Sequence, residues 1–157
     1  MLNRDFKEFA ELLNAQGVEY LLVGGYALAA YGHPRYTGDI DFWVSTAPDN
    51  IQRLLKTLIA FGFALQGLRA DDFGRDTVIQ LGHAPYRIDL LSGIDGVEFD
   101  ACWSRRETVD FDGVTLNLIA LDDFKANKRA VGRAKDLADL QALEHPPAEQ
   151  GGRASDG

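Results

Sequence analysis

Two aspartates, Asp39 and Asp41, lie two positions apart in the segment DIDFWV, which is otherwise apolar. Side chains alternate faces along a β-strand, so both carboxylates would lie on one face and Ile40, Phe42 and Val44 on the other. Two carboxylates on one face repel each other unless a cation lies between them. Mg²⁺ prefers oxygen ligands, so the pair is a candidate metal site, although a solvated strand end would carry the same short motif.

A third aspartate, Asp89, repeats this pattern in the segment YRIDLL. Ile88 and Leu90 would face one way, and Arg87 and Asp89 the other. If this strand lies beside the first, three carboxylates meet. They could hold two metal ions about 4 Å apart, or one metal while the third accepts a proton from an attacking hydroxyl. Alternatively, Asp89 forms only a salt bridge with Arg87 or another cation on the sheet surface.

A glycine pair, Gly24 and Gly25, separates a predicted strand at residues 20–23 from a predicted helix at residues 26–31. Such a turn lets another group approach the backbone and directs free N–H groups toward it. Phosphate suits this place, but a tight turn would need the same glycines. No third glycine has dinucleotide spacing and no Gly-Lys-Ser/Thr follows, so neither of those phosphate motifs is present.

Two further candidates for contact with a phosphate or with the surroundings of the metal, Arg35 and Thr37, stand in the loop HPRYTG just before the aspartates. A proline and a glycine mark this segment as a loop. Residues of these types often serve only to solvate a loop, and that alternative stays open.

Basic residues are concentrated in one segment of a chain whose net charge is −8. A local positive patch facing a carboxylate cluster is what a metal-bound triphosphate needs, and Lys128 and Arg133 are the strongest candidates. The other basic residues of the segment could lie on an exposed helix with ion pairs such as Lys135 with Asp139. The segment contains Lys125, Lys128, Arg129, Arg133 and Lys135.

The rest of the chain supplies elements that position these side chains. Apolar periodicity, caps and turn residues predict helices and strands. An Asp-Gly pair at residues 112–113 predicts a type I′ hairpin turn. The expected helices cover residues 3–17, 26–31, 48–62, 98–106 and 121–144. The expected strands cover residues 20–23, 39–44, 77–81, 86–91, 108–111 and 114–119, with a loop at 67–76 and a turn at 82–85.

Composition indicates one globular domain. The 157 residues are 46% hydrophobic and 25% charged, close to ordinary globular usage. No apolar run approaches the roughly 18 residues of a membrane span, and the N-terminus lacks a signal-peptide layout. One cysteine, Cys102, excludes an intramolecular disulfide and suits a reducing cytoplasm. We expect a domain over residues 1–145 and a disordered tail over residues 146–157, where prolines, glycines and polar residues predominate.

The combined motifs resemble the nucleotidyltransferase superfamily typified by DNA polymerase beta. The resemblance rests on the glycine pair, thirteen residues, then Asp39-Ile-Asp41, and on Asp89 within RIDLL. The downstream segments NK and GRAKDLAD, within residues 127–139, are similar to those of the small bacterial branch. That branch includes minimal nucleotidyltransferases and toxin-type members related to abortive-infection systems. The resemblance spans residues 18–143.

The resemblance implies an α+β fold, close to α/β, with a mixed twisted sheet flanked by α-helices. It implies that Asp39 and Asp41 bind Mg²⁺ or Mn²⁺ together with an NTP such as ATP, that Asp89 completes the site, and that the glycine pair holds the triphosphate. Many members have Gly-Ser where this chain has Gly24-Gly25, so a hydroxyl that could hold a phosphate oxygen is missing.

The predicted function is metal-dependent transfer of an NMP from an NTP to an acceptor hydroxyl, with two Mg²⁺ ions and release of pyrophosphate. Two alternatives stay open: an NTP- or metal-binding component of a toxin–antitoxin-type pair with little turnover, and a purely structural domain. The acceptor could be a tRNA end, another nucleic acid, a protein or a small molecule. A protein partner or a homodimer could supply part of its binding surface. We expect a cytoplasmic protein without a membrane segment.

Overall fold

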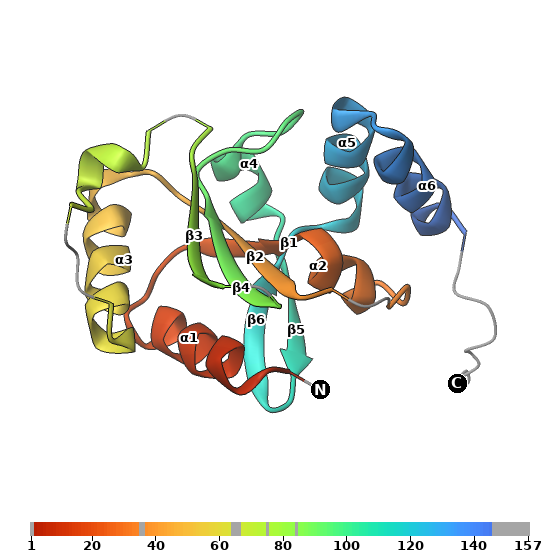
Figure 1. Ribbon diagram of the computed structural model, residues 1–157. Helices are drawn as coiled ribbons and strands as arrows, with labels where there is room; N and C mark the ends of the chain where they lie inside the picture. The colour runs from red at the N-terminus through yellow and green to blue at the C-terminus, as the bar shows by residue number, and fades with distance from the viewer. Residues whose placement is uncertain (1, 35–36, 64–66, 75, 84, 146–157) are drawn as a thin grey trace.

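The computed structural model describes residues 2–34, 37–63, 67–74, 76–83 and 85–145. Helices surround a central six-stranded sheet (Figure 1). In chain order the elements are α1 (Arg4–Ala15), β1 (Tyr20–Val23), α2 (Gly24–Ala30), β2 (Asp39–Val44), α3 (Pro48–Phe61), the 3₁₀ helix η1 (Ala70–Asp72), β3 (Val78–His83), β4 (Tyr86–Leu91), α4 (Phe99–Ser104), β5 (Glu107–Phe111), β6 (Val114–Leu118), α5 (Leu121–Val131) and α6 (Ala134–Leu143).

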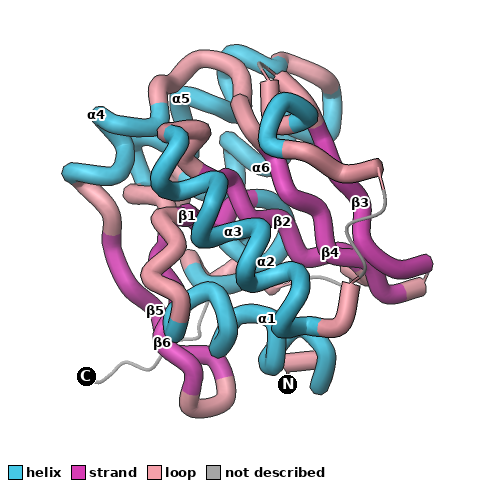
Figure 2. Tube along the Cα trace, turned by 90° about the vertical axis from the view of Figure 1, so that its left-hand side faces the viewer, coloured by secondary structure: helices cyan, strands magenta, loops and turns pink. Residues whose placement is uncertain are grey.

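The sheet is mixed, and its strand order is β3-β4-β2-β1-β6-β5. β2 and β4 are parallel, as are β1 and β6, whereas the other neighbouring strands are antiparallel. The view in Figure 2 shows β3 and β4 at one side of the sheet and β5 and β6 at the other. The expected α+β architecture with a mixed, helix-flanked sheet is therefore confirmed.

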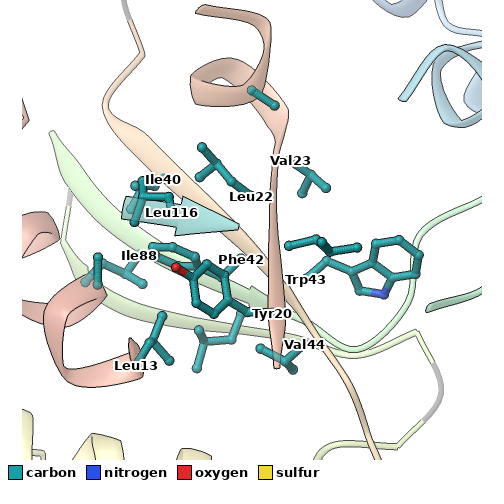
Figure 3. Packing of buried hydrophobic residues seen from close by; sticks show 14 of the residues in the cluster. Leu13, Tyr20, Leu22, Val23, Ile40, Phe42, Trp43, Val44, Ile88 and Leu116 are labelled. Carbon is teal, nitrogen blue, oxygen red and sulfur yellow. The ribbon is translucent and has the colours of Figure 1, made fainter. Parts of the chain in front are cut away.

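One face of the sheet forms the main core together with α1 and α3, which lie side by side in front of it in Figure 2. Phe42 of β2 projects from this face, 5.8 Å from Phe9 of α1 and 5.3 Å from Tyr20 of β1 between ring centroids. Phe9 in turn meets Phe61 at the end of α3, at 5.1 Å. Figure 3 shows Phe42 and Tyr20 among the buried side chains of this core. Burial of these rings holds β2 in one register, because a slip by one residue would turn its apolar side chains to the opposite face.

The opposite face of β2 is covered at only one end. Trp43 is 1% exposed, and its indole meets Phe99 of α4 edge to face at 5.1 Å. Asp39 and Asp41, on the same face as Trp43, are only partly buried. On this face of β2, the two partly buried carboxylates therefore lie next to the closely packed contact between Trp43 and Phe99.

Local signals set most element boundaries as expected. The side chain of Asn3 accepts hydrogen bonds from the backbone N–H groups of Asp5 and Phe6 and caps α1. α3 begins at Pro48 and ends before Gly62, whose φ of +105° suits glycine. The hairpin between β5 and β6 has positive φ at both residues of the Asp-Gly pair, as a type I′ turn requires.

Several elements differ from the predictions. α2 begins at Gly24, so the glycine pair lies in the first turn of this helix and not in a turn before it. β3 continues through Gly82 to His83, because its pairing with β4 persists where a turn was expected. The expected C-terminal helix is divided at Gly132, whose φ of +70° ends α5. The loop predicted at residues 67–76 contains the short helix η1. The predicted disordered tail lies outside the described residues. None of the described helices has the length and apolar content that crossing a bilayer requires.

Two substitutions on α3 test the location of the core. Leu54 is completely buried, whereas Ile59 on the same helix is 59% exposed. We expect Leu54→Ala to lower the free energy of unfolding by about 2 to 5 kcal/mol, because it leaves a cavity. Ile59→Ala is the matched control and should change it by less than about 0.5 kcal/mol. Urea unfolding of both variants measures the difference, and equal losses would contradict this assignment of the buried face.

Candidate active site

The three predicted aspartates lie together on one face of the sheet. β2 and β4 are parallel neighbours, and their register places Asp41 beside Asp89 and Asp39 beside Arg87. Because alternate residues of a strand share a face, all four side chains emerge on the same side. Asp89 is 8% exposed. The strand pairing therefore brings a carboxylate from a distant part of the sequence next to the Asp39–Asp41 pair.

Arg87 already neutralises part of this charge. Its Nε donates a hydrogen bond to Asp89 Oδ1 at 2.9 Å, and its Nη2 donates one to Asp39 Oδ2 at 2.8 Å. The salt bridge between Arg87 and Asp89 that the sequence allowed is therefore present. One guanidinium cannot balance three carboxylates, however, and Asp41 forms no ion pair within the described parts of the chain. With all four groups ionised, the cluster carries a formal charge of −2.

Asp41 shows the electrostatic effect of this imbalance. Burial, which is the largest cause, acts together with the charge of Asp89, a hydrogen bond with Asp89 and the charge of Asp39 to raise the pKa of its carboxyl to about 7. The positive charge of Arg87 acts in the opposite direction but is the smaller influence. A cation placed beside Asp41 would lower its pKa and remove the repulsion.

The glycine pair is required by close contacts with the cluster. α2 begins at Gly24, whose φ is +72°. A Cβ at this position would lie 2.1 Å from Asp41 Oδ2, so any side chain here would displace the carboxylate. A Cβ at Gly25 would lie 3.0 Å from the Thr37 methyl group and 3.4 Å from its hydroxyl oxygen. The glycines are therefore needed for more than the backbone turn, because their lack of side chains lets Asp41 and Thr37 pack closely against the start of α2.

A cavity of about 220 Å³ lies at this point, where the sheet, the start of α2 and the α5–α6 pair meet. It unites most of the residues that the sequence singled out. Asp89 does not line it, and Arg35 lies outside the described residues. The lining residues are Gly24, Gly25, Thr37, Asp39, Asp41, Lys128, Arg133, Lys135 and Asp139.

Two of the predicted phosphate-binding cations are engaged within the protein. Lys128 is 8% exposed, and its Nζ lies 3.0 Å from Asp139 Oδ2 and 3.3 Å from Asp136 Oδ1. Arg133 donates from Nε to Asp136 Oδ2 at 2.6 Å, and this hydrogen bond holds the pKa of Asp136 below its ordinary value. The ion pairs of Lys128 join α5 to α6, and the pair of Arg133 with Asp136 lies within the first turn of α6, so much of this positive charge stabilises the helix pair.

Lys135 is the cation that the sequence analysis undervalued. It is exposed, lines the cavity, and forms no ion pair or hydrogen bond with the described residues. Asp139, its expected partner, pairs with Lys128 instead. The sequence of the basic segment does not separate cations that form ion pairs from cations that are available to a ligand. That distinction depends on the turn at Gly132, which ends α5.

The residues at this site fit a divalent cation in their chemistry. Within the described residues, no three acidic, histidine or cysteine side chains are arranged as ligands of one metal ion as they stand. Carboxylate oxygens are nevertheless the ligands that Mg²⁺ and Mn²⁺ prefer, and the charge of −2 matches one such ion. Asp39 and Asp41 would hold it, since both line the cavity.

The raised pKa of Asp41 predicts a particular pH dependence of stability. Between about pH 4 and pH 7, the folded protein keeps a proton that the unfolded chain has released, so the free energy of unfolding falls as pH rises through this range. Asp41→Asn removes the effect. The variant should gain stability relative to the wild type by up to a few kcal/mol between pH 4 and pH 8. Urea unfolding at both pH values measures this, and parallel pH profiles would contradict it.

Comparisons with known proteins identify the fold. No protein-family model and no curated protein matches the chain by sequence. Among solved structures, a proposed nucleotidyltransferase from Thermotoga maritima aligns with 13% identity and a TM-score of 0.61, covering 90% of this chain and 91% of its own. The lincomycin-bound lincosamide antibiotic adenylyltransferase LnuA aligns with 14% identity and a TM-score of 0.57, covering 92% and 97%. A nucleotidyltransferase-like antigenic protein from Paracoccidioides brasiliensis has 15% identity and a TM-score of 0.51, covering 87% and 72%. The chain has the nucleotidyltransferase fold that its sequence motifs predict.

Proposed function

We propose that this protein is a nucleotidyltransferase that depends on a divalent metal ion and moves an NMP from an NTP, such as ATP, to an acceptor hydroxyl. The observation that carries this proposal is the cavity in which a carboxylate pair, a glycine pair and a free lysine meet. Carboxylates suit a metal, and glycine N–H groups and a lysine suit phosphates. The fold, shared with nucleotidyltransferases, supports the same assignment.

Each side chain has a role in this reaction. Asp39 and Asp41 hold the metal, which when bound neutralises charge on the phosphates and on the attacking and leaving oxygens. Lys135, which lines the same cavity, contacts the triphosphate. Asp89, beside Asp41, accepts the proton of the acceptor hydroxyl as that oxygen attacks the α-phosphorus and pyrophosphate leaves.

The glycine pair and Thr37 provide uncharged contacts to the phosphates. The first N–H groups of a helix have no partner within the helix, so those of α2 are available to a phosphate oxygen. The Thr37 hydroxyl lies close to the place where a side chain at position 25 would begin. We infer that it substitutes for the serine hydroxyl that many members of the superfamily carry there. Arg35 stays a candidate for the same role.

The acceptor is the open part of the proposal. One structural neighbour, LnuA, is an adenylyltransferase of lincosamide antibiotics, which supports a small molecule among the acceptors to be tested. A tRNA end or a protein side chain would need additional surface from a protein partner or a second copy of the chain. We place the enzyme in the cytoplasm, in keeping with its single buried cysteine.

A second function is favoured by the contacts of Arg87. Because its guanidinium already binds Asp39 and Asp89, the chain could bind an NTP and metal as one component of a toxin–antitoxin-type pair, with little turnover. NTP binding that requires Mg²⁺ but never releases pyrophosphate would favour this alternative.

The transfer reaction is tested with labelled nucleotides. We expect incubation with each α-labelled NTP, Mg²⁺ and whole-cell extract to label one fraction among RNA, protein and small molecules. Asp41→Asn should abolish this labelling, because a carboxylate of the metal site is lost, while the circular dichroism spectrum stays unchanged. Labelling by the variant at the wild-type rate would refute the assignment of the site.

The two lysines that line the cavity should respond differently to loss of charge. Lys135→Gln should raise KM for the NTP by roughly tenfold, the effect of losing one charged contact, and leave the melting temperature unchanged. Lys128→Gln is the matched variant, and it should lower the melting temperature because Asp136 and Asp139 lose a buried partner. Steady-state kinetics and thermal melts separate the two effects. A KM unaffected by Lys135→Gln would remove this lysine from the phosphate site.

A further inference from the structure

We propose that Arg87 is a resident cation of the carboxylate cluster and limits it to one divalent metal ion per chain, where two were expected from the sequence. The inference rests on the proposed function, because it concerns the metal site of that reaction. It assigns a role to Arg87, which the sequence analysis considered only as a partner of Asp89.

The position of Arg87 is fixed by the sheet. It stands on β4 two residues before Asp89 and directly opposite Asp39 on β2. Its side chain is 29% exposed and spans the two carboxylates, with donor–acceptor distances of 2.8 Å to Asp39 and 2.9 Å to Asp89. A guanidinium between two carboxylates supplies positive charge that a metal ion held by Asp39 and Asp89 would otherwise have to supply.

The oxygen atoms that remain are sufficient for one ion. Both oxygens of Asp89 lie within 3.4 Å of a guanidinium nitrogen, and Asp39 Oδ2 is also engaged. Asp39 Oδ1 and both oxygens of Asp41 accept no hydrogen bond from Arg87. These three oxygens belong to residues that line the cavity, whereas Asp89 does not line it. The oxygens that Arg87 does not engage therefore belong to the two carboxylates that line the cavity.

The charge balance of the cluster also favours one bound divalent ion. Three carboxylates and one guanidinium sum to −2, which one divalent ion neutralises. Arginine stays protonated at any pH at which the protein is folded, so this contribution is permanent. In the reaction, Arg87 keeps positive charge beside Asp89, where a second metal would otherwise favour release of the proton from the acceptor hydroxyl.

The test is the number and affinity of Mn²⁺ ions bound without nucleotide, measured from the electron paramagnetic resonance signal of free Mn²⁺. The wild-type chain should bind one ion. Arg87→Gln frees the oxygens of Asp39 and Asp89 and removes a repelling charge, so it should bind a second ion or bind the first at least tenfold more tightly.

Arg105→Gln is the matched control. Arg105 also donates two hydrogen bonds to an aspartate, Asp123, but does not line the cavity, so its loss should leave Mn²⁺ binding unchanged.

Several results would overturn the inference. These are two ions per wild-type chain, no ion bound by either protein, or equal affinity and number in the wild type and Arg87→Gln. If Arg87→Gln does not fold, as judged by circular dichroism, the number of ions bound by the wild type decides alone. The transfer assay is independent of this count. Transfer by a wild-type chain that binds two ions refutes only the role of Arg87, whereas absence of both transfer and metal binding refutes the proposed function as well.

Discussion

The repulsion between Asp41 and Asp89 is the interaction on which the rest of the site depends. Parallel pairing of β2 and β4 holds these residues side by side, and neither strand can shift without moving a complete apolar set out of the core. The aromatic cluster around Phe42, on the opposite face, therefore fixes two like charges in place. A structure that enforces such a pair needs positive charge nearby, and Arg87 supplies only part of it.

The positive charges around the cluster are divided between structure and substrate. Lys128 pairs with two aspartates of α6 and holds this helix against α5, whereas Arg133 pairs with Asp136 in the first turn of α6. Lys135 remains available at the cavity. The chain is acidic overall and five of its basic residues lie within residues 125–135, so some of these cations pair with nearby aspartates. A buried cation such as Lys128 needs partners within the protein, whereas an exposed lysine without an ion pair can bind a ligand.

The glycine pair links the sheet to the cavity. Replacement of Gly24 would introduce a side chain into the space occupied by the Asp41 carboxylate, and Gly25 provides room for Thr37. Many nucleotidyltransferases have Gly-Ser where this chain has Gly24-Gly25. In this chain the hydroxyl of Thr37 lies near the place that the side chain of that serine would occupy. A likeness to solved structures at 13% to 15% identity shows the fold without these details, so the chemistry has to be argued from this chain's own residues.

The sequence by itself determined the local features. Alternation within DIDFWV and YRIDLL placed the aspartates on strand faces opposite aliphatic residues, and β2 and β4 have the predicted bounds. Asn3, Gly62 and the Asp-Gly turn act as their residue types require, because caps and turns depend on a few neighbouring residues. Together with the superfamily motifs, these features gave the fold class. Only the tertiary structure decided that Asp41 lies beside Asp89, that Arg87 bridges Asp39 and Asp89, and that Lys135 rather than Lys128 is free. Each of these contacts joins elements distant in the chain, or depends on the break between α5 and α6 at Gly132, and no local pattern encodes the register or the angle at which such elements meet.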